Sequence, residues 1–539
     1  NIMKNILILI ICFTFNAVVF AQQANDNKQV NTIYGGNRID ELLMNINRLY
    51  VDDVKENELI DAAIIGMLEK LDPHSTYISK DDVDDANQRI EGNFVGIGIR
   101  FQLLKDTLMV VETIPGGPSE KIGLRAGDRI IAVDGKSIAG VGLKNSQVRE
   151  KLMGDLGSKV AIDVKRNGQS KPFNFTITRD KIPVNSVDCA YMVAPGIGYI
   201  KLNTFARTSH EELLKGFYQL KSAGMESLIL DLQGNGGGLL QAAQVIADEF
   251  LSENKLIVYS EGRVQPRQEL TARYPGNWES GKLVVLVDEN SASASEILAG
   301  AIQDWDRGIL VGRRTFGKGL VQRPIDLSDG SVVRLTIARF YTPTGRFIQK
   351  PYTDLDAYEN DKINRLKHGE LMHLDSIKFP DSLKYKTRIT GRTVYGGGGI
   401  MPDFFVPLDT TYITNFYRDV AGTGAFNSFS LTYVNENRDR LKSDYSTIEN
   451  FKQRFVIDKK MMDDFLNYAY KENKKIVLNE SEYKKSKYVM ELRLKATIAQ
   501  DLFGLDGFYY IFNDSNDMLQ KAISILNSKE YKKVKLATN

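Results

Sequence analysis

The sequence is 539 residues long, which is more than one hydrophobic core normally supports and predicts three or four domains. Its hydrophobic content of 42% and charged content of 26% are ordinary for globular protein. The 70 Lys and Arg residues are balanced by 68 Asp and Glu residues, so the formal net charge is +2. This balance argues against a nucleic-acid-binding protein and against a polybasic membrane-binding surface.

The first residues have the pattern of a targeting segment. Lys4 precedes an apolar run from Ile6 to Phe20, and small residues at its end place a cleavage site after Ala21. The alternative is a retained membrane anchor, but the run is shorter than the roughly 20 residues that span a bilayer. We therefore expect a signal peptide at 1–21 and an exported, periplasmic protein, associated with the inner membrane only if the segment is retained.

The spacing of apolar residues divides the rest of the chain. Residues 22–90 have helical spacing, whereas residues 91–180 contain short strands separated by glycines and predict a small β-rich domain. Residues 181–407 alternate strands and helices, which predicts an α/β core with a charged, aromatic insertion at 352–392. Residues 408–539 are polar and helical. We expect a multidomain α/β core with an inserted β-rich domain, an N-terminal helical region and a mostly helical C-terminal extension.

Three segments match cofactor-binding or metal-binding sequence motifs only in part. Gly312–Lys318 fits the start of a phosphate-binding P-loop, but Gly319 replaces the hydroxyl that would hold Mg²⁺, and no helix pattern follows. Gly234–Gly238 lacks the third glycine of a dinucleotide fingerprint. His368 and His373 miss the i, i+4 spacing of a zinc-binding helix. We therefore expect no metal and no organic cofactor.

Ser293 is a candidate nucleophile. The four histidines are scattered, and none lies in a glycine-rich turn beside a nucleophile, so a Ser-His-Asp triad is not expected. Ser293 follows an apolar strand and opens a helix, where backbone N–H groups and the helix dipole favour an oxyanion. The alternative is simple N-capping, since Ser293 and Glu296 form a good capping box. The segment alone leaves both roles open, and capping is the commoner one.

Lys318 is a candidate general base for this serine. It lies between two glycines, after a strand that should neighbour the strand leading to Ser293. A lysine with its ordinary pKa cannot take a proton from serine at neutral pH, but burial disfavours the ammonium and lowers that pKa. The alternative is a surface lysine in a turn.

The remaining cysteine after signal removal, Cys189, cannot form an intrachain disulfide and is expected to be structural.

At these segments the sequence resembles the carboxy-terminal processing peptidase family, also called tail-specific proteases. The resemblance is carried by a glycine turn, a nucleophile segment and a lysine segment in family order, namely Asp231–Leu239 (DLQGNGGGL), Ser291–Ile297 (SASASEI) and Thr315–Gln322 (TFGKGLVQ). Further matching motifs are Leu71–Tyr77, Leu327–Ser331, Tyr341–Arg346 and Gly399–Asp403. The resemblance spans about residues 40 to 407.

The resemblance implies a serine endopeptidase that needs no cofactor. It implies that Ser293 is the nucleophile, that Lys318 is the general base and that Gln322 orients the lysine amine. Such an enzyme forms an acyl intermediate on the serine, which water then hydrolyses. An exported adaptor with an inactive peptidase core is the alternative, and the presence of all three residues favours the enzyme.

The resemblance also implies an oxyanion hole. Its donors would be the backbone N–H groups of Ala294 and of Gly236 or Gly237. Glu296 matches a family position near the site, for which we expect a structural role. Gln233 stands where the family usually has arginine, which removes a charge beside the glycine turn and puts an ion pair there in doubt.

Residues 91–180 resemble a PDZ domain. The loop that would bind a terminal carboxylate through backbone N–H groups, and add the peptide as an extra strand, consists of Gly96, Ile97, Gly98 and Ile99. The alternative is a PDZ domain that only packs. We expect protein substrates with unstructured C-termini. A further partner would be an adaptor or a second copy of the chain, and two copies would pair through their N-terminal helices.

Overall fold

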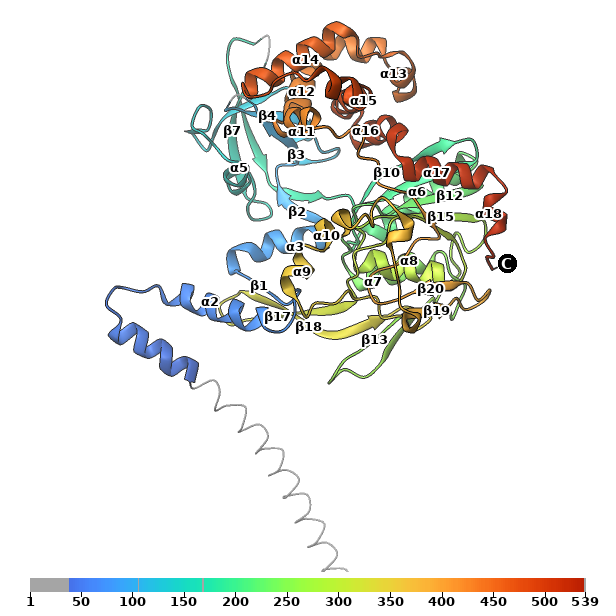
Figure 1. Ribbon diagram of the computed structural model, residues 1–539. Helices are drawn as coiled ribbons and strands as arrows, with labels where there is room; N and C mark the ends of the chain where they lie inside the picture. The colour runs from blue at the N-terminus through green and yellow to red at the C-terminus, as the bar shows by residue number, and fades with distance from the viewer. Residues whose placement is uncertain (1–37, 105, 167–168, 538–539) are drawn as a thin grey trace, which may run out of the picture. The chain divides into compact units, whose positions relative to one another are not determined.

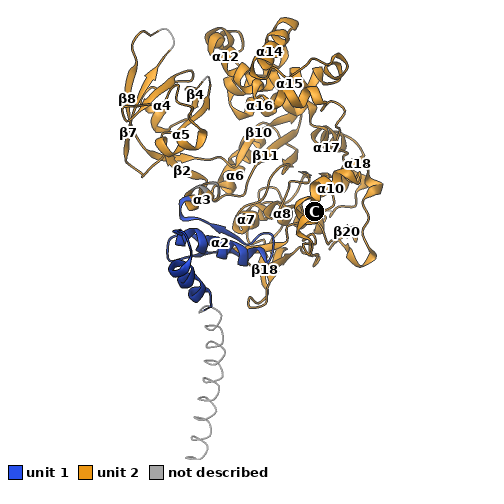
Figure 2. Cartoon of the chain, turned by 60° about the vertical axis from the view of Figure 1, so that its left-hand side comes forward, with its two compact units in different colours: residues 1–81, 324–335 blue, residues 82–323, 336–539 orange. Residues whose placement is uncertain are grey.

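The computed structural model describes residues 38–104, 106–166 and 169–537, so the expected signal segment lies outside the described residues. The chain forms two compact units, coloured separately in Figure 2: residues 1–81 with 324–335, and residues 82–323 with 336–539. Within the described part, no helix is both long and apolar enough to cross a bilayer.

From residue 38 onward, the smaller unit contains two α-helices and a short antiparallel ladder. A helix at residues 38–49 precedes α2 (Glu56–Glu69), and β1 (Thr76–Ile78) pairs with the first residues of β18 (Val332–Tyr341). The Tyr77 hydroxyl of β1 donates to the Asp61 carboxylate of α2 at 2.7 Å, which fixes the helix to the strand. The expected N-terminal helical region is confirmed.

The β-rich domain begins the larger unit, after α3 (Val83–Glu91). Its main antiparallel sheet has the order β3-β4-β5-β7-β8, with β6 beside β5, and β2 pairs separately with β9. Gly98 has a φ of 74°, a left-handed conformation that glycine adopts readily, and this turn separates β2 from β3. The elements are β2 (Asn93–Gly96), β3 (Ile99–Leu103), β4 (Leu108–Thr113), α4 (Pro118–Lys121), β5 (Arg129–Val133), β6 (Lys136–Ser137), α5 (Asn145–Leu152), β7 (Lys159–Lys165), β8 (Phe173–Thr178) and β9 (Asp180–Pro183).

The expected α/β core is a six-stranded sheet in the order β10-β11-β12-β15-β16-β21. Strands β10 and β11 are antiparallel and the other neighbours are parallel. The central strands are mostly apolar and almost entirely buried, as expected for a parallel sheet covered on both faces. The core elements are β10 (Val187–Ala194), β11 (Ile197–Leu202), α6 (Ser209–Ser222), β12 (Ser227–Asp231), α7 (Leu240–Asp248), β15 (Lys282–Val287), α8 (Ala294–Asp304), β16 (Ile309–Gly312) and β21 (Phe404–Phe405).

Helices cover both faces of this sheet (Figure 1). Side chains of α6, α7 and α8 form one hydrophobic cluster with the strands, and side chains of α17 (Asp517–Asn527) form another on the opposite face. Cys189 is buried in the second cluster, where burial raises the pKa of its thiol well above the ordinary value. This environment suits a structural cysteine.

The remaining strands and short helices of the core include those of the charged, aromatic insertion predicted at 352–392. They are β13 (Leu256–Glu261), β14 (Gln268–Thr271), β17 (Leu320–Asp326), α9 (Leu355–Glu359), α10 (Asp361–Lys367), β19 (Lys384–Lys386) and β20 (Thr393–Tyr395). The insertion at 352–392 therefore contains the helices α9 and α10 and the strand β19, which pairs with β20 directly after the insertion. Its elements are short, which explains why its sequence shows no sustained period.

The C-terminal extension is helical, as expected. It consists of α11 (Asn415–Gly422), α12 (Ala425–Asp444), α13 (Ile448–Arg454), α14 (Lys459–Glu472), α15 (Glu480–Phe503), α16 (Leu505–Phe512), α17 and α18 (Glu530–Lys533). Most of these helices share one core rich in phenylalanine and tyrosine. Because α17 covers the central sheet, the extension is continuous with the α/β core.

The extension also contacts the β-rich domain. Leu431 of α12 packs against Met109 on β4. Arg100 of β3 lies 3.7 Å from the buried Asp501 carboxylate of α15. Burial raises the pKa of Asp501 to about 7, although Arg100 and Arg438 oppose that shift. The contact uses one face of the β3–β4 pair, and β3 remains an edge strand of its sheet.

Candidate active site

Three segments leave adjacent parallel strands at the same edge of the central sheet. Asp231 at the end of β12 pairs with Leu286 of β15, and Val287 of β15 pairs with Gly312 at the end of β16. The glycine turn, the Ser293 segment and the Lys318 segment follow these three strands in that order. Sites in open α/β sheets form beyond the carboxyl ends of the strands, so the topology brings the three motifs together.

Ser293 has a strained backbone at the N-terminus of α8. Its φ of 56° and ψ of −112° lie outside the conformations that non-glycine residues normally adopt, at a cost of about 1–3 kcal/mol. A serine that serves only as an N-cap has extended dihedrals. Capping therefore does not account for this conformation, which is typical of residues held in place at functional sites.

The glycine turn at residues 233–238 supports the strained serine. The Asn235 carbonyl oxygen accepts hydrogen bonds from the Ala292 N–H at 3.0 Å and the Ser295 hydroxyl at 2.8 Å, on either side of Ser293. Gly237 has a φ of 100°, and a Cβ added to it would lie 2.8 Å from the Ser293 Cβ. Only glycine permits this close approach.

Two backbone N–H groups beside Ser293 have no acceptor among the described residues, those of Ala294 and Gly236. A Cβ on Gly236 would meet no atom within 4 Å, so this glycine borders open space. The Gly237 N–H instead donates to the Asn235 side-chain oxygen at 2.9 Å. Of the two glycines predicted as alternatives for an oxyanion hole, Gly236 thus has the available donor.

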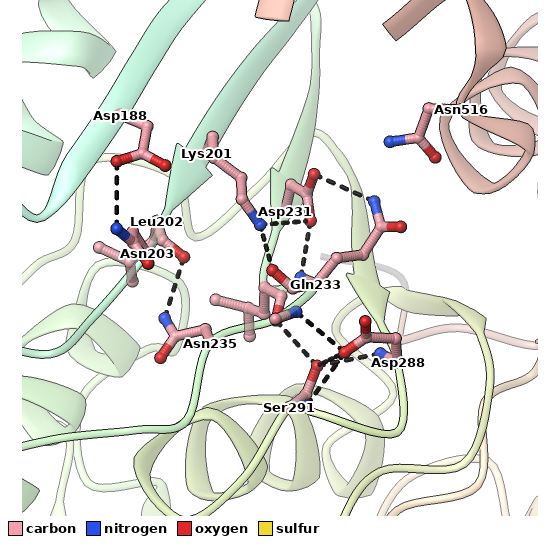
Figure 3. A network of polar contacts seen from close by, with 12 residues as sticks. Asp188, Lys201, Leu202, Asn203, Asp231, Gln233, Asn235, Asp288, Ser291 and Asn516 are labelled. Atoms are coloured by element: carbon pink, nitrogen blue, oxygen red, sulfur yellow. Dashed lines mark hydrogen bonds and ion pairs between the residues drawn. The ribbon is translucent and has the colours of Figure 1, made fainter. Parts of the chain in front are cut away.

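A buried ion pair fixes the start of the glycine turn (Figure 3). The Lys201 amine from β11 lies 3.3 Å from the Asp231 carboxylate and also donates to the Gln233 carbonyl oxygen. The same carboxylate accepts hydrogen bonds from the Tyr199 hydroxyl at 2.6 Å and from the Gln233 N–H at 2.7 Å. Gln233 thus carries no charge at this turn, and a buried ion pair beside it is made by Lys201 and Asp231.

Sequence reasoning missed Lys201, although a signal for it was present. It is one charged residue within the fully buried strand β11, which otherwise carries apolar side chains and glycine. Buried lysines are rarely found without a partner. The neighbouring strand offers that partner, because Lys201 and Asp231 are directly paired across the β11–β12 ladder.

Glu296 connects the nucleophile segment to the lysine segment. It is fully buried in the first turn of α8. One carboxylate oxygen, Oε2, accepts the N–H groups of both Ser293 and Lys318, each at 2.8 Å. The other oxygen accepts the Thr315 hydroxyl at 2.5 Å and the Gly317 N–H at 2.7 Å. Burial raises the pKa of the Glu296 carboxyl, and these four donors oppose that shift.

Lys318 and Gln322 are also brought together. Both side chains are half-buried, and the lysine amine donates to the Gln322 side-chain oxygen at 3.1 Å. Gln322 belongs to β17, which begins two residues after Lys318. The geometry thus joins Ser293, Lys318 and Gln322 in one region at the end of the central sheet.

The predicted tail-binding loop lies at the edge of the β-rich domain. Gly96 ends β2, Ile97 is buried, Gly98 makes the left-handed turn and Ile99 begins β3. Within the described part of the chain, β3 pairs only with β4. An edge strand of this kind presents backbone groups to which an extended peptide can add.

The described residues hold no group of three or more His, Cys, Asp or Glu side chains arranged to bind a metal ion. The arrangement contains instead a hydroxyl, a primary amine and two N–H donors. Such a set can attack a carbonyl carbon and stabilise the resulting oxyanion.

Four family models match parts of the chain. Peptidase family S41 matches residues 196–358, and a PDZ domain matches residues 109–166. The N-terminal domain of the activating protease CtpB matches residues 15–82, and a family of unknown function (DUF8443) matches residues 416–504. The α/β core, the β-rich domain and the helical N-terminal region thus correspond to known domains.

Curated relatives align with more than half of this chain. The carboxy-terminal-processing protease of Bartonella bacilliformis is 35% identical over 62% of this chain and 76% of its own length. The carboxy-terminal processing protease CtpB of Bacillus subtilis is 33% identical over 57% of this chain and 64% of its own length. Among solved structures, the photosystem II D1 C-terminal processing protease is 28% identical, covering 69% of this chain and 92% of that chain, with a TM-score of 0.35. The chain belongs to the carboxy-terminal processing proteases, which are serine-type peptidases of family S41.

Proposed function

We propose that this protein is an exported endopeptidase in which Ser293 is the nucleophile and Lys318 the general base, and that it selects substrates by their C-terminal tails. One observation carries the proposal: a single buried Glu296 oxygen accepts the backbone N–H groups of both Ser293 and Lys318. Two segments that follow different strands are thereby bound to the same oxygen atom. The strained backbone of Ser293 adds support, because strain of this kind persists where it serves a function.

The proposed reaction is acyl transfer. The neutral Lys318 amine takes the proton of the Ser293 hydroxyl as its oxygen attacks the substrate carbonyl carbon. The N–H groups of Ala294 and Gly236 stabilise the negative charge that develops on the carbonyl oxygen. Lys318 then returns the proton to the leaving amine as the peptide C–N bond breaks, and water hydrolyses the acyl-enzyme with the lysine again accepting a proton. Gln322 orients the amine through the 3.1 Å hydrogen bond.

Tail recognition is assigned to β3 of the PDZ domain. An added peptide would pair with the exposed edge of β3, and its terminal carboxylate would meet backbone N–H groups near Gly98. Val148 and Leu152 of α5 share the hydrophobic core with Ile99 and Phe101 of β3, so a helix borders the strand as peptide capture requires. An edge strand with apolar side chains beside it suits an extended, apolar C-terminus.

Export and self-association complete the proposal. The targeting pattern at 1–21 supports transfer to the periplasm. The smaller unit carries large apolar side chains that are exposed, including Leu42, Met44, Leu49, Ile65 and Met67. Exposed apolar surface of this kind marks interaction sites, which supports pairing of two copies through the N-terminal helices.

Replacing either member of the proposed pair tests the mechanism. Ser293→Ala and Lys318→Ala should each reduce cleavage of an unstructured protein with a free apolar C-terminus by at least about a thousandfold. Ser280→Ala and Lys378→Ala, which change exposed residues, should leave turnover unchanged. Cleavage is followed by gel electrophoresis and mass spectrometry. Wild-type turnover by Ser293→Ala would remove the assignment, and turnover by Lys318→Ala would remove the lysine from it.

Glu296→Gln should reduce kcat by roughly a hundredfold or more, because an amide group would face backbone N–H donors that now meet a carboxylate. Steady-state kinetics on the same substrate give kcat and KM, and the exposed residue change Glu253→Gln provides the control. Circular dichroism confirms that the variant is folded. A folded Glu296→Gln enzyme with wild-type kcat would show that the shared carboxylate is dispensable.

The free carboxylate of the substrate tail is the test of PDZ recognition. Converting it to a carboxamide should lower kcat/KM by about tenfold, since one charge-assisted set of hydrogen bonds is lost. Acetylating the N-terminus of the same peptide removes a charge elsewhere and should have little effect. Equal cleavage of the free and amidated peptides would contradict recognition of the terminus.

The compartment, first residue and mass of the mature protein test export and self-association. Expressed from its full sequence, it should be recovered from the periplasm with Gln22 as its first residue, and light scattering should give the mass of a dimer. Recovery from the cytoplasm would contradict export. An intact residue 1–21 segment in the membrane fraction would indicate the anchor instead, and a monomer would refute pairing.

A further inference from the structure

The segment that carries Lys318 has no regular secondary structure, yet its backbone N–H groups are all bound. Residues 315 to 319 donate, in order, to the Ile400 carbonyl, the Ser291 carbonyl, both oxygens of Glu296 and the Gln349 side chain. These acceptors belong to the core and to the nucleophile segment. The N–H side of the lysine segment is therefore fixed relative to Ser293.

The carbonyl side of the same segment is held by the insertion at 352–392. Arg365 of α10 is buried, with 4% of its surface exposed. Its Nη1 atom donates to the carbonyl oxygens of Arg314 at 3.2 Å and Thr315 at 2.9 Å, and its Nη2 atom donates to that of Phe316 at 3.3 Å. One guanidinium thus binds three consecutive carbonyls that lead directly into Gly317 and Lys318.

Neighbouring residues hold Arg365 in this position. Its Nε atom lies 3.1 Å from the Asp361 carboxylate and 3.7 Å from that of Glu370. Glu370 also pairs with Arg314 through two contacts of 2.7 and 2.8 Å, which links the insertion to the lysine segment a second time. Burial and the nearby Arg314 lower the pKa of Arg365. A buried guanidinium placed beside another arginine is costly, so its retention calls for a specific role.

Lys350 binds the next carbonyl group of the lysine segment. Its backbone N–H donates to the Gly317 carbonyl oxygen at 3.0 Å. Its amine lies 4.0 Å from the ring centre of Phe316 and 4.1 Å from that of Tyr358, and it pairs with Asp361 at 3.1 Å. The side chain of Phe316 is therefore fixed between the core and α9. Together, Arg365 and Lys350 bind every carbonyl from residue 314 to residue 317.

We infer that Arg365 is a positioning residue for Lys318, and that the insertion at 352–392 serves as a brace for the lysine segment. The inference rests on the proposed role of Lys318 as the general base. A planar guanidinium presents several donors in a fixed geometry, which a lysine ammonium cannot reproduce. Without it, three carbonyls lose this donor, that of Thr315 within a buried contact, and the segment shifts or admits water. The amine is then displaced from the serine and becomes easier to protonate.

Two substitutions test this role, Arg365→Lys and Arg365→Met. Each should lower kcat by about tenfold or more with KM changed by less than about twofold, because the tail-binding domain is untouched. The acidic limb of kcat/KM against pH should move to higher pH, because a hydrated lysine is more readily protonated. Lys367→Met changes an exposed residue of the same helix and should leave kcat and the pH profile unchanged. In Arg365→Ala, added guanidinium ion should restore part of kcat.

Thermal unfolding of each variant is measured alongside. If Arg365→Met does not fold, the kinetics of Arg365→Lys test the positioning role of Arg365. A folded Arg365→Lys enzyme with wild-type kcat and an unchanged pH profile would overturn the inference. The failure of the proposed function has a different signature, because Lys318→Ala would then retain activity whatever Arg365 does. A loss of kcat with no shift in pH dependence and no rescue by guanidinium would reduce Arg365 to a structural residue and also overturn the inference.

Discussion

The site depends on a carboxylate that has been taken out of water. Glu296 is fully buried, and its two oxygens are occupied by donors from the serine segment and the lysine segment. Leaving a buried carboxylate without partners would cost several kcal/mol. The two segments must therefore keep their positions relative to Glu296 for the core to remain stable. The central sheet delivers the segments to one edge, and Glu296 sets the spacing between them.

Motif order and strand alternation predicted much of this arrangement. The segments of Ser293 and Lys318 each follow an apolar strand, and neighbouring parallel strands end at the same edge of a sheet. The sequence left both capping and a nucleophile open for Ser293, and the structure has the capping box together with a backbone strain that has no local signal in the sequence. Nor could the sequence choose between Gly236 and Gly237, since the choice depends on a hydrogen bond from Gly237 to Asn235 within the folded turn.

Other parts of the site were not predictable because they depend on contacts between distant segments. Arg365 meets the lysine segment about 50 residues away in sequence, and its short helix gives no clear apolar period. The α17 helix, near the end of the chain, covers one face of the central sheet. Such contacts follow from the fold as a whole. They show that both the insertion and the extension belong to the framework around the active site.

Covalent labelling tests most directly whether Ser293 is activated by Lys318. A serine-directed fluorophosphonate should attach to Ser293 in the wild-type enzyme, as mapped by mass spectrometry after proteolysis. Labelling should fall to background in folded Lys318→Met, since the hydroxyl then lacks a base. A label on another serine, or equal labelling of Ser293 in the absence of the lysine, would contradict the account.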